Sequence, residues 1–496
     1  MHRVRMPLYL LALTFLMLSS AWLWRLDGQT AQPTATVFEG ARLITGDGSS
    51  PIENSAFIVS GDKFTQVGRR GELRIPAGAA HVDLTGKTVM PALIDLHGHI
   101  GFQNVVQGTM SKAFYTRENL IDHLERLAYN GVGATVGVGD LEDRSDLRGG
   151  RTNWGDVPLQ VRKEVIPNAA LFRTAGTGIA WPGSGPQGDP SRVDVPYPVS
   201  TVEEARAAVQ DYVRMKPEFI KIWVDDRGGT KKTLTPPLYR AIAEEAHKYN
   251  VPVGVHNVTL ANAKELMRAG VEGWLHVPVR GGEAVDDELI AVVKQRIARN
   301  DRPKMWMTPA LITAWMDTQG GKRPPWLDDP LLRDTYSPGQ IEEYWGRPLA
   351  KMTPEQVERV RRDFELQASN AMKLRAAGMR IVSGTDTGQT RFLIGYFNQL
   401  DLESMVAMGL TPSEALVAAT RDPAEIARIN AGLVRAGKSA DFIVLDANPL
   451  EKIGNSRRIN QVYLRGQKVD RSALNAKWLA EQNHATKSSL NNSKQK

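Results

Sequence analysis

The central part of the chain alternates short apolar runs with stretches of helical periodicity, and this alternation limits the folds that it can adopt. Each run has the length of a strand buried on both faces, and the segments between the runs carry apolar side chains at helical spacing. Strands that alternate with helices form parallel sheets. The eight runs are VMPALIDLH, GATVGVG, ALFRTAG, EFIKIWV, VPVGVH, VEGWLH, KMWMTPA and MRIVSGTD.

Eight strands of this kind are the number that a closed parallel barrel requires, so we predict an α/β chain built on a (β/α)8 TIM-type barrel. An open doubly wound sheet is the alternative, but no glycine-rich phosphate loop with a downstream acidic residue supports it. One helix is predicted to begin after Thr116, the expected N-cap, and to end near Gly131. Further helices are expected after Thr235, Thr259, Asp286, Thr353 and Thr411.

Both flanks of this region carry β-type patterns separated by Gly, Asp and Ser turns, such as SAFIVS near one end and SADFIVLD near the other. We expect the two flanks to pair into one small β-sandwich. The predicted division is therefore 33–88 for the first part of the sandwich, 89–436 for the barrel and 437–475 for the second part. The polar residues 476–496, rich in Ser, Asn and Lys towards the end, are interpreted as a disordered tail.

The first 32 residues have the pattern of a targeting segment. Arg3 and Arg5 precede an almost wholly apolar run from Pro7 to Trp24, which is the order of an export signal. We therefore expect an exported protein, periplasmic or secreted, with cleavage before Pro33. The alternative is an uncleaved membrane anchor, because the apolar run approaches the roughly 17–20 residues that span a bilayer.

Composition excludes several classes of site. The 496 residues include no cysteine, so disulfides, thiolate metal ligands and a cysteine nucleophile are ruled out. The net charge of +7 is spread over interleaved acidic and basic residues without a sustained basic block. Nucleic acid is therefore not an expected partner. A hydrophobic fraction of 42% is enough for a sizeable core.

Polar residues recur where the predicted strands end, and barrel enzymes place their chemistry at that end of the barrel. His97 and His99 stand two residues apart at the end of the first strand, so on an extended chain both imidazoles project to the same side. The other strand-end candidates are Lys221, His256, His276 and Asp386. Taken singly, each has a structural alternative: a hydrogen-bonded histidine, a snorkelling lysine or a helix-capping aspartate.

This order of residues resembles the two-metal branch of the amidohydrolase superfamily. The sequence motifs are most similar to those of its Xaa-Pro dipeptidase-like and imidazolonepropionase-like group. The similar segments are MPALIDLHGHI, FIKIWVDD, SGTD, GLTPSEALVAAT and GKSADFIVLDANPL. The resemblance implies two divalent metal ions, with zinc the first expectation. His97, His99 and Asp386 would hold one ion and His256 and His276 the other, while Lys221, carboxylated by CO2, would bridge them. Gln399 and Asp401 stand where this family often has a His and a Glu.

The implied function is hydrolysis of an amide-type C–N bond in a dipeptide, an N-acyl amino acid or a cyclic amide by a hydroxide that bridges the metal ions. Asp386 and His276 are the candidate catalytic residues. An esterase, lactonase or deaminase on the same scaffold is the alternative, and a non-catalytic binding protein is a third hypothesis. Arg227 and Arg280 follow two of the strands and are candidates to bind a substrate carboxylate, with salt bridging as the ordinary alternative.

The sequence leaves the oligomeric state open, and association with further copies of the chain is compatible with it. The segment from Leu311 to Ala350 follows the seventh strand and contains five aromatic residues: Trp315, Trp326, Tyr336, Tyr344 and Trp345. A connection of this length is more typical of a lid or a pocket wall than of a turn.

Overall fold

The computed structural model describes residues 35–140, 157–186, 192, 195–280, 282–299, 304–388 and 391–493, and all structural statements concern these residues. The segment interpreted as an export signal or anchor, 1–32, lies outside them. Within the described part of the chain, no helix has both the length and the apolar character that crossing a membrane demands.

Two parallel sheets occupy the centre of the molecule, which confirms the predicted α/β class. The smaller sheet has the order β11–β10–β7, and the larger has the order β13–β12–β14–β15–β16–β17–β18. All eight predicted strand regions contain strands of these sheets. Their bounds are β7 Leu93–Gly98, β10 Val132–Gly137, β11 Leu171–Thr174, β12 Ile179–Ala180, β13 Tyr197–Pro198, β14 Ile220–Val224, β15 Val253–Asn257, β16 Gly273–Leu275, β17 Trp306–Thr308 and β18 Arg380–Ile381.

Backbone hydrogen bonds join the chain after β18 to β7, the first strand of the smaller sheet. The Leu96 amide donates to Ser383 O at 3.1 Å, and the Asp386 amide donates to His97 O at 2.7 Å. A parallel bridge pairs Gly98 with Thr387. These contacts bring Asp386 next to the two histidines that end β7, although 289 positions (386 − 97) separate it from His97 in the chain.

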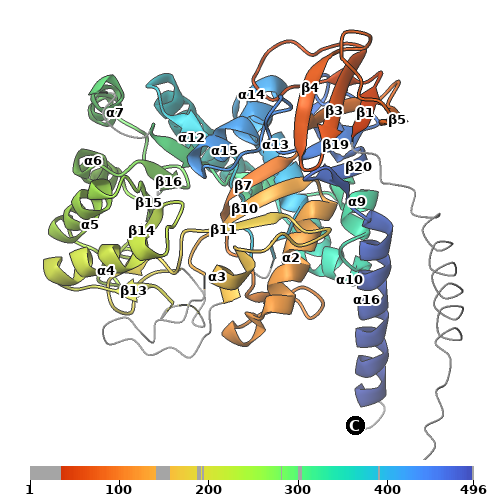
Figure 1. Ribbon diagram of the computed structural model, residues 1–496. Coiled ribbons are helices and arrows are strands. Elements are labelled where there is room, and N and C mark those ends of the chain that lie inside the picture. The colour runs from red at the N-terminus through yellow and green to blue at the C-terminus, as the bar shows by residue number, and fades with distance from the viewer. Residues whose placement is uncertain are drawn as a thin grey trace, which may run out of the picture.

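Helices follow the strands and cover the outside of the sheets. In Figure 1, α4 to α7 lie beside β13 to β16, and neighbouring helices of this series pack against each other. The helices after Thr116, Thr259, Thr353 and Thr411 begin at those residues, and each threonine side chain accepts a backbone N–H as an N-cap. The bounds are α2 Arg117–Tyr129, α3 Val157–Val161, α4 Val202–Arg214, α5 Pro236–Lys248, α6 Leu260–Ala269, α7 Asp287–Arg299, α12 Pro354–Ala376, α13 Tyr396–Met408, α14 Pro412–Ala418 and α15 Arg421–Ile426.

The long connection after β17 folds into short helices that form a wall beside two loops. Gln340 donates its side-chain N–H to the carbonyl of Val105, and the Trp345 indole donates to Arg391 O at 2.8 Å. The connection is thereby bonded to the loop after β7 and to the loop after Asp386. Its elements are α8 Ile312–Asp317, η2 Pro325–Asp328, α9 Pro330–Arg333, α10 Pro338–Ile341, η3 Glu342–Gly346 and α11 Arg347–Ala350, and short elements elsewhere are β8 Gln103–Asn104, β9 Thr109–Met110, η1 Lys112–Phe114 and η4 Ile453–Arg457.

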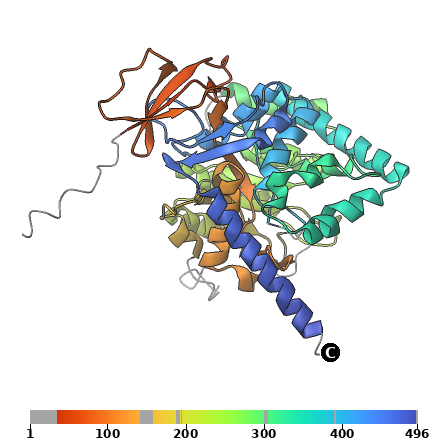
Figure 2. The ribbon, with the colours of Figure 1, turned by 90° about the vertical axis from the view of Figure 1, so that its right-hand side faces the viewer.

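Two further sheets lie beside the parallel sheets in Figures 1 and 2: one is built from the N-terminal flank alone, and the other combines strands from both flanks of the chain. Their shared core is aromatic: the Phe442 ring stacks on Tyr463 at 4.6 Å and meets Phe38 edge-on at 5.2 Å. The run VMPALIDLH is split at Ala92, because β6 pairs with β19 while β7 enters the parallel sheet. The sheets are β4 Lys63–Arg69, β3 Ser55–Ser60, β1 Thr36–Glu39 and β5 Ala80–Asp83, and β2 Arg42–Leu43, β6 Thr88–Pro91, β19 Phe442–Leu445, β20 Ile459–Leu464 and β21 Gln467–Lys468.

The segment predicted as a disordered tail from residue 476 is helical over most of its length. Helix α16 spans Arg471–Ser493 and extends away from the body in Figures 1 and 2. Its Trp478 is fully buried, and the indole N–H donates to Asp122 Oδ1 of α2 at 2.7 Å. The prediction was wrong here because a single buried tryptophan in a polar sequence fixes the first turns of the helix.

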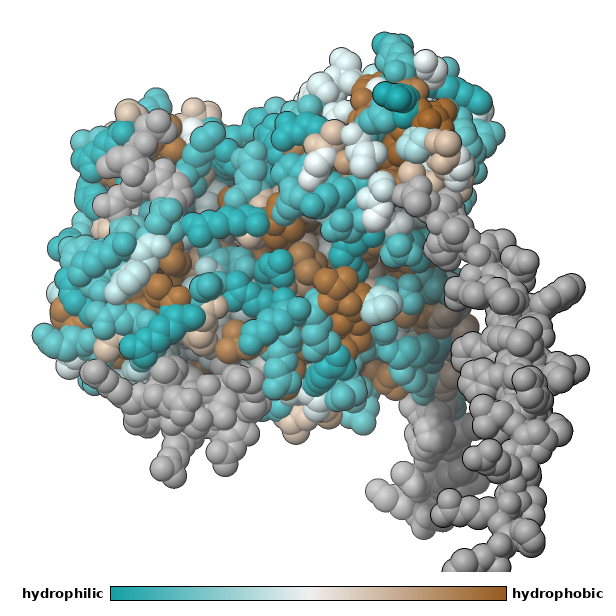
Figure 3. All heavy atoms as spheres, viewed as in Figure 1, coloured by the Kyte–Doolittle hydropathy of each residue, from teal (hydrophilic) through white to brown (hydrophobic). Residues whose placement is uncertain are grey.

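The surface on the side drawn in Figure 3 is mostly hydrophilic, with hydrophobic residues in separate patches. Among the described residues, the large hydrophobic side chains that are exposed are Ile75, Val165, Tyr249 and Leu479. Exposed apolar residues that stand singly are normal for a soluble surface.

Candidate metal centre

His97, near the end of β7, and His99, directly after the strand, are both buried. Their ring centroids are 5.1 Å apart. Asp95, on the same strand, fixes the local backbone because its carboxylate accepts the His97 amide at 2.9 Å. The same carboxylate accepts the Thr385 hydroxyl at 2.6 Å and the Asn398 amide at 3.0 Å. Asp95 therefore holds the end of β7 against the segment that carries Asp386.

Asp386 lies directly opposite this histidine pair. Its Oδ1 is 3.0 Å from His99 Nε2 and 3.4 Å from His97 Nε2. The three side chains form a group whose ligand atoms all lie within 4.8 Å of one another, so they could hold a metal ion. Asp386 adopts φ +56°, a left-handed conformation that costs a non-glycine residue about 1–3 kcal/mol and is typical of functional sites.

His276 and His256 extend the cluster from β16 and β15. The His276 ring is 5.1 Å from the His97 ring and also 5.1 Å from the His256 ring. Its Nε2 is 3.9 Å from Asp386 Oδ2, and its backbone has φ +117°. The fold thus brings all four predicted histidines and Asp386 to one place at the carboxyl ends of the strands.

The buried nitrogens of this cluster fit a metal ion. His97 Nε2, His99 Nδ1 and His276 Nδ1 are buried and make no hydrogen bond among the described residues. Buried polar atoms are nearly always satisfied, so several unsatisfied nitrogens in one cluster call for an explanation. Imidazole and carboxylate ligands suit zinc and other divalent transition metals, and the site therefore has the donor set of a metal centre.

Burial sets the protonation of these groups. It lowers the pKa of His256 to about 4 and the pKa values of His97 and His276 well below their usual range. Neutral imidazole is the form that binds metal ions. Burial alone would raise the pKa of Asp386, but its interactions with the surrounding histidines outweigh that effect and hold the pKa well below the usual value.

Lys221 is placed in the middle of β14 and is 1% exposed. Its Nζ lies 4.9 Å from the centroid of the Trp223 ring, and Trp223 is the register partner of His256 in the neighbouring strand. Burial lowers the pKa of the Lys221 amine well below its usual value. A neutral amine in this position is nucleophilic and is chemically able to react with CO2.

Two residues that hold the imidazoles were missed from the sequence. Asp225 Oδ2 is 3.2 Å from His256 Nε2, and the Thr308 hydroxyl is 3.3 Å from His97 Nδ1. A signal existed for Asp225, which shares with Lys221 the odd-numbered face of the extended segment FIKIWVDD. The sequence around Thr308 contains no comparable signal. Such partners orient metal-binding histidines and select their tautomers.

The two arginines predicted to meet substrate have different surroundings. Arg227 is engaged by the protein, because its guanidinium pairs with the Asp225 carboxylate and donates to the carbonyl of Gly185. This is the ordinary salt-bridge alternative. Arg280 lies within electrostatic reach of Asp386 and Asp225, and burial lowers the pKa of its guanidinium. Of the two, Arg280 is the one whose charge interacts with Asp386 of the cluster.

Comparisons with known proteins agree with this geometry. A model of the amidohydrolase family matches residues 349–469, which include Asp386. An ochratoxinase from Aspergillus niger is 26% identical over 472 residues, covering 86% of this chain and 84% of that protein. The crystal structure of a candidate prolidase from Bifidobacterium longum is 26% identical, with a TM-score of 0.64, and the match covers 91% of this chain and 99% of the other.

A Xaa-Pro dipeptidase crystallised with methionine in its active site has the same fold, with a TM-score of 0.63 at 20% identity and coverage of 88% and 99% of the two chains. The resemblance stated from sequence motifs is therefore confirmed. Residues 349–469 carry an amidohydrolase family domain, and the ochratoxinase and prolidase-type relatives indicate an enzyme that acts on carbon–nitrogen bonds.

Proposed function

We propose that this protein is a metal-dependent hydrolase that cleaves amide-type C–N bonds of small molecules, with dipeptides, N-acyl amino acids and cyclic amides as the substrate classes. The observation that carries the proposal is the convergence of His97, His99, His276 and Asp386, from three strand ends that are remote in sequence, on one buried point. An ochratoxinase and prolidase-type proteins among its relatives support the reaction class.

We propose further that the two parallel sheets belong to one (β/α)8-type barrel. The hydrogen bonds from the segment after β18 to β7 support closure on one side. On the other side, the Ala175 amide donates to Gly137 O at 2.8 Å and the Glu218 amide donates to Thr174 O at 3.3 Å, which carries the smaller sheet towards β14. In such a barrel the cluster lies at the carboxyl-terminal mouth, where βα loops admit substrate.

For the metal content we propose two divalent ions, with zinc as the first choice. His97, His99 and Asp386 would hold one ion, His256 and His276 the second, and a carboxylated Lys221 would bridge them. Bound ions of this kind acidify water and polarise a substrate carbonyl. The burial of Lys221 and the unsatisfied imidazole nitrogens support this assignment.

The protein's own residues have definite tasks in the reaction. Asp386 takes a proton from the attacking water on its carboxylate and delivers it to the leaving nitrogen, a role that typically contributes about 10²- to 10⁴-fold. Its strained backbone and the hydrogen bond of its amide to His97 O fix where that carboxylate points. His276 Nε2 lies 3.9 Å from the Oδ2 oxygen of this carboxylate. Arg280 is proposed to bind a carboxylate of the substrate.

The variant Asp386→Asn tests the proposal. We expect the metal content, measured by elemental analysis, to stay close to that of the wild type while turnover falls by about 10²-fold or more. Substrates are sought in a panel of N-acyl amino acids, Xaa-Pro and other dipeptides and cyclic amides, with matched esters and lactones to detect the alternative chemistry. A wild-type protein that binds no divalent metal, or an Asp386→Asn variant that keeps full turnover, contradicts the proposal.

We also propose that residues 1–32 direct export and that 33–88 and 437–475 form one sandwich domain beside the barrel domain. The shared aromatic core of the two flanking sheets supports the domain division. Expression of the full chain with N-terminal sequencing of the product tests the export signal. An intact N-terminus in the membrane fraction would favour an anchor instead.

A further inference from the structure

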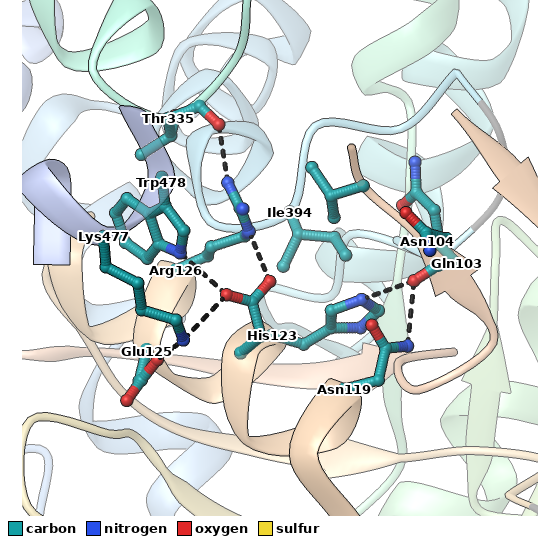
Figure 4. A network of polar contacts seen from close by, with 12 residues as sticks. Gln103, Asn104, Asn119, His123, Glu125, Arg126, Thr335, Ile394, Lys477 and Trp478 are labelled. Carbon is teal, nitrogen blue, oxygen red and sulfur yellow. Dashed lines mark hydrogen bonds and ion pairs between the residues drawn. The ribbon is translucent and has the colours of Figure 1, made fainter. Parts of the chain in front are cut away.

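The stretch that follows His99 is held in place by two polar side chains of helix α2. The Gly101 amide donates to His123 Nδ1 at 2.9 Å, and His123 Nε2 lies 2.8 Å from Gln103 O. Asn119, one turn earlier, donates to the carbonyls of Gly101 at 2.8 Å and Gln103 at 2.9 Å. Figure 4 shows His123 and Asn119 reaching Gln103 from the same helix.

The partners of His123 determine its protonation. A backbone amide can only donate, so Nδ1 must be the acceptor for Gly101; a carbonyl can only accept, so Nε2 must carry the proton that Gln103 receives. His123 is therefore the neutral Nε2–H tautomer with both ring nitrogens satisfied. It is fully buried, and burial lowers its pKa to about 4. Loss of Nδ1 would take this acceptor from the buried Gly101 amide, whereas loss of the Nε2–H would leave the Gln103 carbonyl with the Asn119 amide as its remaining side-chain donor.

The loop that His123 holds has little freedom to rearrange. Gly101 adopts φ +99°, and a Cβ there would lie 2.5 Å from the Tyr115 ring. It stands two residues after His99, whose own amide donates to Thr387 O at 2.6 Å. The backbone is thus held at the His99 amide by Thr387 and, two residues later, at the Gly101 amide by His123.

Helix α2 is itself anchored on its other side, so it can serve as a fixed support. Asp122 accepts the Arg126 guanidinium at 2.8 Å and the Trp478 indole at 2.7 Å. Arg126, which is buried, also donates to Thr335 O in the long connection after β17. Figure 4 shows this network next to His123, with Lys477 and Trp478 of α16 at the left and Thr335 above them.

We propose that His123 is a positioning residue of the metal centre: by fixing Gly101 and Gln103, it keeps the His99 imidazole directed at Asp386. The inference rests on the proposed function only in taking His99 as a metal ligand. A residue with this task acts on metal affinity and on the geometry of the bound ion, whereas a residue that only fills the core acts on stability alone.

The test compares three variants in the full chain. His123→Phe keeps the ring volume and removes both hydrogen bonds. His123→Gln offers one acceptor and one donor at the end of a flexible chain. Leu124→Ala, the next residue of α2 and fully buried, serves as the matched control because it weakens the helix core without touching the loop. Co²⁺ alone is titrated into metal-free protein, and its affinity and its visible absorption spectrum are recorded together with the melting temperature.

We expect His123→Phe to bind Co²⁺ about tenfold more weakly or worse, with an altered spectrum, and His123→Gln to recover most of the affinity. Leu124→Ala should lose thermal stability and keep the wild-type spectrum. If His123→Phe retains the wild-type affinity and spectrum, the positioning role is overturned. If His123→Phe does not fold, His123→Asn decides, because its amide is too short to replace both ring nitrogens: Co²⁺ binding weaker than that of the wild type supports the role, and wild-type affinity and spectrum overturn it.

The design separates this inference from the function on which it rests. Wild-type protein that binds no Co²⁺ would overturn both. Wild-type binding that is unaffected in His123→Phe would overturn the role of His123 and leave the metal centre in place.

Discussion

A buried carboxyl group in α13 makes the stability of this protein depend on pH in a way that one substitution should remove. Asp401 is 1% exposed, and its carboxyl group receives the Ser383 hydroxyl at 2.7 Å and the Ser404 hydroxyl at 3.3 Å. Burial raises its pKa to about 7. In the folded protein this group is therefore protonated at acidic pH, and it must lose its proton inside the core as the pH rises.

The size of this pH dependence follows from the linkage between proton binding at Asp401 and folding. An aspartate in the unfolded chain has a pKa of about 3.9, so folding raises the pKa by about 3 units, and each unit corresponds to about 1.36 kcal/mol. Because the folded pKa is raised, the stabilising contribution is complete below about pH 4 and is lost progressively as the pH rises to about 7. The wild type should therefore lose about 4 kcal/mol of unfolding free energy through Asp401 across that window.

The variant Asp401→Asn does not titrate and keeps a side-chain oxygen for Ser383. We expect the unfolding free energy of the variant minus that of the wild type, both measured by urea denaturation, to increase by about 2–3 kcal/mol from pH 5 to pH 8. Asp363→Asn removes an exposed carboxylate of α12 and controls for the loss of one negative charge. A difference between Asp401→Asn and wild type that is the same at both pH values would refute the protonated state of Asp401.

Three further changes have expected outcomes. Gly388→Ala places a Cβ 1.7 Å from His99 O at φ +108°, so we expect more than about a tenfold loss of divalent metal affinity, measured by competition with a chelator. Asp225→Asn removes the carboxylate beside His256, and we expect about 10–100-fold weaker binding of the proposed second metal ion, seen as reduced stoichiometry by elemental analysis. Trp478→Ala removes a fully buried side chain and should weaken the packing of α16 on α2 by about 3–5 kcal/mol. We expect limited proteolysis to cleave α16 faster in this variant, and unchanged protease resistance would contradict this.

The strands and several helix starts could be predicted because their signals are local. Each strand is a short apolar run, and four of the expected helix starts have a threonine whose side chain caps the first turn. The strand-end histidines and Asp386 could be grouped because the carboxyl ends of parallel strands meet at one edge. The chain after β18 does meet β7 there, and Asp386 lies 3.0 Å from His99.

Other features depend on contacts that no local pattern records. Thr308 touches His97 across 211 positions of sequence, and Arg126 reaches Thr335 across 209. Helix α16 has a polar composition that is typical of a disordered tail, and its position is fixed by Trp478 against α2. The support that His123 gives to the loop after His99 could not be read from the sequence for the same reason, since its partners are backbone atoms.

The pairing of β6 with β19 has a consequence for how the protein is made. The ribosome delivers Thr88 long before Phe442, and at about 5–20 residues per second the early strands must wait on the order of tens of seconds for their partners. During that time they present unpaired edges, which are prone to wrong association. Newly synthesised chains should therefore depend on chaperones until the strands at residues 442–468 have left the exit tunnel.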